Sequence, residues 1–335
     1  MLKTIDLESH YYDPAFIQVL IDRSRLRNYP FYDQENDTIY WSEKIIVKQG
    51  GVLKYLANAM EKRVSLMDKW GVDMSVISSS PGIEELPIET SIKVCKLSNQ
   101  NIHAITQKYP ARFRGSATLP VGDISAACEE LERCVKEYGF VGWQAHSNFG
   151  LKTPDHPSFK PIFEKCAELG VYVYLHPHYL FGERFERFGF ALAGAGLGFT
   201  VDTMTSILSL ILSGIFDDYP DLKVVLGHLG EAIPFLLERI DSRMAFTPKE
   251  QVKNKHNVRY YFKNNIWVTT SGNLSKEAFK CTSDVLGLDH ILLGTDYPYE
   301  NYNETMSFIE NLPLGYDDRA KLYGQNAIEY LNLVF

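Results

Sequence analysis

The sequence predicts an α/β fold, a distorted (β/α)8 barrel of the TIM type with insertions over the C-terminal face of the strands. Short β-branched or aromatic segments alternate with segments of helical periodicity along the chain. Most of the strand segments are nearly continuous apolar runs, which are typical of strands buried on both faces of a parallel sheet. Eight such units favour a closed barrel over an open doubly wound sheet. We therefore interpret residues 1–335 as one domain, a usual length for such barrels.

The predicted strands and helices follow one another in the order that a barrel requires. The strands are expected at residues 3–8, 74–79, 113–119, 140–145, 170–175, 222–227, 265–270 and 289–294. Helices are expected at residues 125–137, 159–169, 204–216, 274–286 and 317–332. The first of these helices has a capping signal at Asp123 and Ser125 and a stop signal at Gly139. A strand followed by a helix, repeated along the chain, indicates a parallel sheet.

Two segments are too long for a minimal barrel. Residues 11–60 separate the first strand from the helix before the second, and residues 178–200 follow the fifth strand and are rich in Gly and Phe. Both come after strands, so both are expected over the C-terminal face, where barrel active sites form. We interpret them as lids or pocket walls. For residues 11–60, an interface role is the alternative.

Composition and charge exclude several classes of protein. There are 34 basic and 42 acidic residues, a formal net charge of −8, so the basic excess of a nucleic-acid-binding protein is lacking. No apolar run approaches the length of a membrane span, and the N-terminus lacks the apolar core of a signal peptide. Five cysteines without a CxxC pair argue against a disulfide framework or a thiolate zinc site. We expect a cytoplasmic protein with neither nucleic-acid nor membrane partners.

Polar residues stand where the predicted strands end. They are Glu8 and His10 at the first strand, His146 at the fourth, His176 at the fifth, His228 at the sixth, Ser271 at the seventh and Asp296 at the eighth. In a barrel, all these strand ends converge on one mouth. Residues far apart in the sequence are therefore expected around a single site.

Each of these residues also has a plainer interpretation when taken alone. The alternation of Glu8 and His10 fits an exposed strand edge, and His176, after an apolar run, fits a satisfied core histidine. Asp296 ends a buried strand, where a carboxylate needs a cation or several donors to stay ionised. Together, Glu8, His10, His176 and Asp296 supply two nitrogen and two carboxylate ligands. This set suits Zn²⁺ or Mn²⁺ with room for substrate.

His228 is followed by Glu231 within the sequence GHLGE. The carboxylate of Glu231 is placed to hydrogen-bond the imidazole and fix its tautomer. The alternative is a helix start with Glu231 in its first turn, stabilised by the helix dipole. The two interpretations are compatible.

Four segments, residues 7–10, 174–178, 213–241 and 292–301, resemble the amidohydrolase superfamily. They read LESH, YLHPH, SGIFDDYPDLKVVLGHLGEAIPFLLERID and LLGTDYPYEN. More narrowly, they are similar to its non-oxidative decarboxylase branch, which includes γ-resorcylate, 5-carboxyvanillate and aminocarboxymuconate semialdehyde decarboxylases. Many superfamily hydrolases begin with an HxH pair, whereas this chain begins with Glu8-Ser9-His10, as the γ-resorcylate type does. The resemblance spans nearly the whole chain.

The resemblance implies a role for each matching residue. It implies metal binding by Glu8, His10, His176 and Asp296, with His228, held by Glu231, as a catalytic histidine. It further implies substrate contacts from Arg239, Tyr299, His146, Phe199 and Arg63. The resorcylate type has asparagine at the position of His146, which indicates a substrate other than resorcylate.

The function that the resemblance implies is non-oxidative decarboxylation of a hydroxylated aromatic carboxylate, such as an ortho-hydroxybenzoate. Asp296 is expected to protonate the ring carbon before CO2 leaves, with His228 assisting. One divalent ion, Mn²⁺ or Zn²⁺, and no organic cofactor are expected, because the run at residues 194–199 lacks the context of a nucleotide-binding loop. The resemblance also implies a homodimer or homotetramer. The alternative function is metal-dependent hydrolysis or hydration of a lactone or a ring-opened dicarboxylate, and a binding protein on an inactive barrel is a third.

Overall fold

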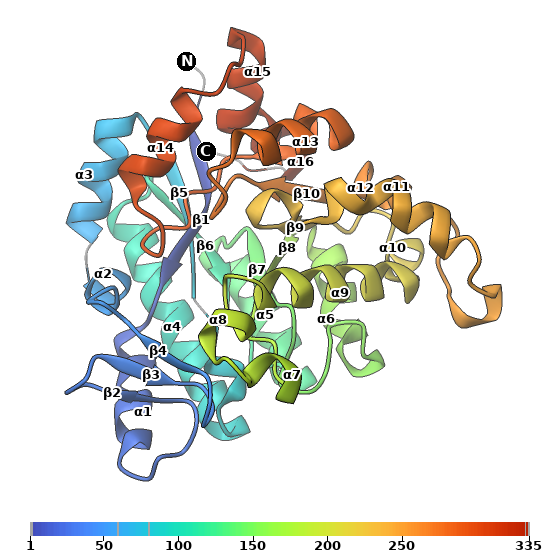
Figure 1. Ribbon diagram of the computed structural model, residues 1–335. Coiled ribbons are helices and arrows are strands. Elements are labelled where there is room, and N and C mark those ends of the chain that lie inside the picture. Colours follow the sequence, from blue (N-terminus) through green and yellow to red (C-terminus); the bar gives the residue numbers. More distant parts are fainter. Residues whose placement is uncertain (1–2, 59, 80, 332, 334–335) are drawn as a thin grey trace.

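A computed structural model describes residues 3–58, 60–79, 81–331 and 333 and shows a barrel of eight parallel strands (Figure 1). The strands are β1 (Ile5–Tyr11), β5 (Met74–Ser79), β6 (Phe113–Ala117), β7 (Gly142–His146), β8 (Tyr172–His176), β9 (Val224–Leu226), β10 (Ile266–Thr269) and β11 (Ile291–Leu292). They neighbour one another in chain order, as expected for a (β/α)8 fold. Each overlaps the segment predicted from the sequence, so the predicted fold class is confirmed.

The first and last strands close the barrel. The backbone N–H of Leu7 donates to the carbonyl of Leu293 at 2.9 Å, and the N–H of Asp296 donates to the carbonyl of Glu8 at 2.9 Å. The register of β1 against β5 shifts between Asp6 and Ser9, which distorts the barrel at this seam. The seam thus brings the first and last predicted site residues side by side.

Helices pack between and around the strands. The longer ones are α1 (Pro14–Ser24), α3 (Met60–Trp70), α4 (Ile88–Lys108), α5 (Ile124–Tyr138), α6 (Lys160–Leu169), α9 (Gly198–Leu212), α11 (Ile233–Met244), α13 (Lys276–Leu286) and α14 (Tyr302–Glu310). The shorter ones are α2 (Leu53–Asn58), α7 (Glu183–Glu186), α8 (Phe190–Ala193), α10 (Ile215–Asp218), α12 (Val258–Phe262), α15 (Tyr316–Ala320) and α16 (Asn326–Leu331).

The capping signals at α5 act as predicted, whereas two other predicted helices are interrupted. The Asp123 side chain accepts a hydrogen bond from the N–H of Ala126, and Gly139 ends α5 with φ 68°. The helix expected at residues 204–216 is wrong in its bounds, because α9 starts six residues earlier and the chain turns at Gly214, where φ is 80°. The helix expected at residues 317–332 is split by a π-helical turn at Lys321–Gln325.

The two long segments meet over the same end of the barrel. Within residues 11–60, the strands β2 (Phe31–Asp33), β3 (Thr38–Tyr40) and β4 (Ile46–Lys48) form a small antiparallel sheet. Figure 1 shows this sheet close to α7 and α8, and the Ser42 hydroxyl lies 3.5 Å from the Glu186 carboxylate. A hydrophobic cluster joins the two segments and includes Trp41 and Tyr179, whose rings lie 4.8 Å apart. We call this small sheet together with residues 178–200 the wall.

Residues Phe190–Leu212 are apolar and long enough to cross a membrane by length and composition alone, a longer stretch than we expected. The chain here is not one straight helix, since non-helical residues 194–197 separate α8 from α9. Ile207, Leu210 and Ile211 of α9 are buried in the main hydrophobic core. We therefore interpret α9 as a helix of the barrel's outer layer.

Candidate metal centre and active site

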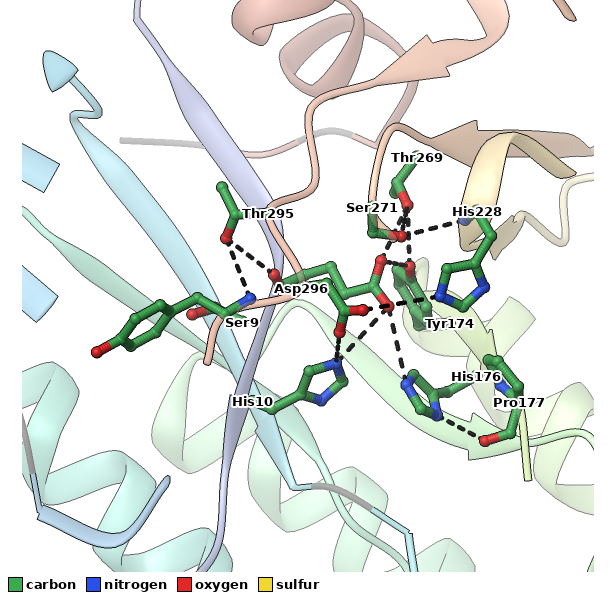
Figure 2. A network of polar contacts seen from close by, with 12 residues as sticks. Ser9, His10, Tyr174, His176, Pro177, His228, Thr269, Ser271, Thr295 and Asp296 are labelled. Atoms are coloured by element: carbon green, nitrogen blue, oxygen red, sulfur yellow. Dashed lines mark hydrogen bonds and ion pairs between the residues drawn. The ribbon is translucent and has the colours of Figure 1, made fainter. Parts of the chain in front are cut away.

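Four side chains from three parts of the barrel converge at its mouth. Glu8 and His10 come from β1, His176 from the end of β8, and Asp296 from the loop after β11. All four are buried, and their ligand atoms lie within 4.8 Å of one another (Figure 2). The Nε2 atom of His10 is 3.0 Å from Asp296 Oδ1 and 3.6 Å from Glu8 Oε1. The prediction that these residues come together is confirmed.

The chemistry of this group fits a divalent cation. Among the described residues, the buried Oε1 of Glu8 and Nδ1 of His10 have no hydrogen-bond partner, an unusual state for buried polar atoms. Although burial opposes a charged imidazole, the carboxylates of Asp296 and Glu8 raise the pKa of His10 to about 9. The carboxylates therefore favour a positive charge between them. Two imidazoles and two carboxylates are ligands that Zn²⁺ and Mn²⁺ accept.

The surrounding contacts orient these side chains. The Nδ1 atom of His176 lies 2.7 Å from the carbonyl of Pro177, a geometry in which Nδ1–H donates and the Nε2 lone pair faces the centre. The second carboxylate oxygen of Glu8 accepts hydrogen bonds from the hydroxyls of Tyr174 and Thr269. The Thr269 hydroxyl is also 2.8 Å from that of Ser271. Hydroxyl groups from β8 and β10 thus hold one oxygen of Glu8, and the other is left for the centre.

The backbone at the mouth adopts conformations that side-chain-bearing residues rarely take. Asp296, His228, Leu229 and Glu231 all have positive φ angles between 55° and 58°. Such local strain persists where the surrounding structure enforces it and is common at functional sites. At Gly272, φ is 60°, and a Cβ atom there would overlap the imidazole of His228. The position of His228 therefore depends on the absence of a side chain at residue 272.

His228 lies between two carboxylates. Its Nδ1 atom is 2.8 Å from Glu231 Oε1, and its Nε2 atom is 3.9 Å from Asp296 Oδ2. Burial disfavours the imidazolium, yet Glu231 and Asp296 raise the pKa of His228 well above its usual value. The hydroxyl of Thr200 donates to the other oxygen of Glu231 at 2.7 Å. The expected contact between His228 and Glu231 is present, but Glu231 is not in a helical first turn, since α11 begins at Ile233.

A cavity of about 350 Å³ opens above these residues. Its floor includes His176, His228 and Asp296, and Glu300 and Tyr299 lie beside them. The wall residues that line it are Ile39, Trp41, Val47, Lys48, Tyr179, Phe190, Ala195 and Phe199, joined by Gln49 and Val52 before α2. The pocket-wall interpretation of both long segments therefore agrees with the structure.

Three predicted substrate-contacting residues lie at or near the cavity. Tyr299 lines it, with its ring centre 5.3 Å from that of His10. Phe199, at the start of α9, also lines it. His146 lies near the cavity but does not line it. It is buried behind His176, with ring centres 5.7 Å apart, and its Nδ1 atom pairs with Glu84.

The two predicted arginines lie elsewhere. Arg63, on α3, is fully buried and donates to the Ser9 hydroxyl and to the carbonyl of His10 at 2.7 Å, so it supports β1 from behind. Arg239 is exposed on α11 and does not line the cavity. Neither arginine lines the cavity of its own chain, and the expectation that they contact the substrate stays a prediction.

Sequence reasoning missed a buried polar group beneath the wall. Glu84 and Glu85 follow β5, and Glu85 lies 3.2 Å from Nε2 of His178. Burial, together with the nearby Glu84 carboxylate, raises the pKa of Glu85 to about 8, whereas burial lowers that of His178 to about 4. This pair could have been found by the criterion used for the other site residues, because Glu84 and Glu85 follow the end of a predicted strand. Trp41 and Tyr179 had no comparable signal.

Comparisons with known proteins agree with this geometry. The family model described as amidohydrolase matches residues 58–333. The chain is 35% identical over 285 residues to the γ-resorcylate decarboxylase of a Polaromonas species, covering 81% of this chain and 87% of that protein.

Solved structures match over nearly the full length. The 5-carboxyvanillate decarboxylase of Sphingomonas paucimobilis superimposes with a TM-score of 0.87 at 28% identity, covering 100% of both chains. A dihydroxybenzoic acid decarboxylase of Polaromonas, with bound manganese and the inhibitor 2-nitroresorcinol, gives a TM-score of 0.85 at 30% identity. It covers 99% of this chain and 98% of that one.

Proposed function

Because the chain belongs to the amidohydrolase family, we propose that its site performs metal-dependent, non-oxidative decarboxylation of a hydroxylated aromatic carboxylate. The observation that carries the proposal is the buried group Glu8, His10, His176 and Asp296, of which His176 and Asp296 line a cavity sized for a small molecule. The similar enzymes are carboxy-lyases, and two of the similar structures hold manganese with an aromatic inhibitor.

The four floor residues would hold one divalent ion. Such an ion supplies positive charge that orients a carboxylate and its ortho-hydroxyl group and neutralises them. The donor set admits Mn²⁺ or Zn²⁺, and we propose manganese first because similar structures contain it. We propose no organic cofactor.

Asp296 is proposed as the proton donor to the ring. The substrate hydroxyl gives its proton to the Asp296 carboxylate as the anion binds. Asp296 then delivers that proton to the ring carbon that bears the carboxylate. The bond between that carbon and the carboxylate breaks, CO2 leaves, and the bonding electron pair restores the aromatic ring. The balance requires no oxidant or reductant.

His228 and Glu231 assist that transfer. Nε2 of His228 faces Oδ2 of Asp296 at 3.9 Å, and Glu231 fixes the opposite ring nitrogen. A charged His228 stabilises the Asp296 carboxylate before and after the proton moves. Tyr299 is proposed to lie beside the substrate ring, with Phe199 at its outer edge.

We further propose a cytoplasmic homodimer or homotetramer. Phe235 and Arg239, four residues apart on one face of α11, are both exposed, and Phe235 has 80% of its surface accessible. In an oligomer, this face would be covered, and Arg239 could serve only a site outside its own chain's cavity. Light scattering of the purified protein measures the assembly state.

A substrate panel tests the proposed function. Manganese-loaded protein is mixed with dihydroxybenzoates, and ultraviolet spectra and CO2 release are followed, with metal-depleted protein and Asp296→Asn as controls. Metal-dependent CO2 release is the expected result. Ring-opened dicarboxylates and lactones are included, because hydrolysis or hydration of these compounds without CO2 release would replace decarboxylation by the alternative chemistry.

A further inference from the structure

The cavity is larger than an aromatic ring requires, and its excess volume is apolar. A cavity of about 150 Å³ holds benzene, whereas this one measures about 350 Å³. The polar floor residues are at one end. The small sheet and the following turn contribute mostly aliphatic or aromatic side chains, with Lys48 and Gln49 as the polar exceptions. More than half of the cavity is thus left for groups attached to the ring.

The register of the small sheet shows which of its faces forms the cavity. Ile39 of β3 pairs directly with Val47 of β4, so their side chains lie on one face, and both line the cavity. Trp41 follows Ile39 by two residues and shares that face. Ile46 is on the opposite face, is 43% exposed and does not line the cavity. One face of the sheet is therefore an apolar surface directed at the substrate.

One cation, Lys48, lies at the edge of this surface. It pairs with Thr38 and alternates with Val47, so its exposed side chain is on the same face as Ile46. The side-chain amide of Gln49 is occupied by a hydrogen bond to the carbonyl of Val47 at 3.1 Å. Among the described residues that line the cavity there is no arginine, and Glu300 adds a carboxyl group.

The apolar surface is part of a packed layer. Ile39 and Trp41 are almost fully buried, and they belong with Tyr179 to a hydrophobic cluster separate from the barrel cores. The Tyr179 ring contacts both Trp41, at 4.8 Å, and Phe199, at 5.2 Å. The wall is thus preformed, and water against it would find few hydrogen-bond partners.

We propose that the wall forms a subsite for an apolar alkyl substituent, so that the substrate is an alkylated hydroxybenzoate carrying a single carboxylate. The proposal rests on the proposed function and specifies its substrate class. An alkyl group displaces water from the partly exposed side chains of Val47 and Val52, over the packed layer of Ile39 and Trp41, and gains burial. A second carboxylate would meet these apolar side chains and Glu300 without a facing cation.

A homologous series tests the subsite. We compare 2,4-dihydroxybenzoate with its 6-methyl, 6-propyl and 6-pentyl derivatives and with a 5-carboxy derivative, and measure kcat/KM for each. The expected result is a rise of up to about fourfold per methylene until the cavity is full, since this is the effect of burying one methylene. The 5-carboxy compound should be the poorest substrate. A flat series, or a preference for the dicarboxylate, would overturn the proposal.

Two variants test whether any gain in kcat/KM comes from the face of the small sheet that lines the cavity. Val47→Thr keeps the β-branched shape but places a hydroxyl on the apolar surface, and it should reduce the ratio of kcat/KM for the 6-pentyl compound to that for the unsubstituted compound. Ile46→Thr makes the same change on the opposite face and should leave that ratio unchanged. Equal effects of both variants would contradict a subsite on this face.

A binding measurement separates this proposal from the proposed function. Calorimetry with the corresponding 5-alkylresorcinols, which need not react, measures affinity directly. Rising affinity with chain length in a protein that releases no CO2 would support the subsite while refuting decarboxylation. CO2 release from the unsubstituted acid, with no gain in either affinity or kcat/KM along the series, would refute the subsite alone.

Discussion

The floor of the cavity and its wall come from different parts of the chain and use different interactions. The floor consists of side chains at barrel strand ends, such as Glu8 and His176, fixed by hydrogen bonds and an unusual backbone. The wall consists of inserted segments held together by aromatic and aliphatic packing, as between Trp41 and Tyr179. We infer that the two parts have different roles: the floor residues carry the chemistry, and the wall residues select the substrate.

The largest expected effect is on kcat and comes from a substitution in the floor. Asp296→Asn should lower kcat by at least the roughly 10²–10⁴-fold typical of losing a general acid, because asparagine keeps an oxygen but cannot deliver the proton. Turnover is compared at matched metal occupancy, with solvent deuterium at the ring carbon followed by NMR. His228→Asn serves as the comparison. Near wild-type turnover of Asp296→Asn would transfer the role of proton donor to His228.

The second effect concerns the buried carboxyl group beneath the wall. The pKa of Glu85 is raised to about 8 by burial and by Glu84, so the folded protein retains a proton that the unfolded chain releases near pH 4.5. Stability should therefore fall as pH rises from 4.5 to 8. Glu85→Gln should remove this loss and stabilise the protein by on the order of 3 kcal/mol at pH 8.5.

Urea unfolding at pH 5.5, 7 and 8.5 measures this effect. The control is Glu89→Gln, because Glu89 is exposed a few residues further along the chain. The difference in free energy of unfolding between Glu85→Gln and the wild type should grow with pH, whereas that for Glu89→Gln should stay constant. A pH-independent difference for Glu85→Gln would show that Glu85 is ionised in the folded protein.

A third, smaller effect tests how the floor is supported. Tyr174→Phe removes a hydrogen bond to Glu8 and should weaken metal affinity about 10–100-fold, as is typical for partners of ligands. Tyr172→Phe is a matched control, because the buried Tyr172 hydroxyl in the same strand has no hydrogen-bond partner among the residues that the structure describes. Competition with a chelator measures both affinities. Equal losses in the two variants would indicate general damage to β8.

The smallest effect is expected in the wall. Phe199→Leu should raise KM by roughly tenfold or less, the scale of small changes in an apolar pocket, with little change in kcat and metal content. Phe188→Leu is the control, because Phe188 is 60% exposed in the same inserted segment and does not line the cavity. A large fall in kcat for Phe199→Leu would show that the wall also contributes to the chemical step.

The same division explains what could be predicted from the sequence. His176 and Asp296 could be located because each ends a buried apolar strand, and parallel strands of a barrel end at one face. Trp41 could not be assigned to the cavity. It follows a strand of only three residues, which is too short to show a hydrophobic alternation, and the face directed at the cavity depends on the partner strand. Arg63 and Arg239 were assigned by resemblance alone, and resemblance does not show whether a guanidinium faces the cavity or the protein behind it.

The seam between β1 and the loop after β11 has a consequence for biosynthesis. Glu8 and His10 leave the ribosome long before Asp296, whose N–H bonds to the carbonyl of Glu8 and which follows 288 residues after Glu8. At roughly 5–20 residues per second, that interval is about 15–60 s. During it, the nascent chain holds only part of its ligand set. Metal loading is therefore expected to be a late, post-translational step that follows closure of the barrel.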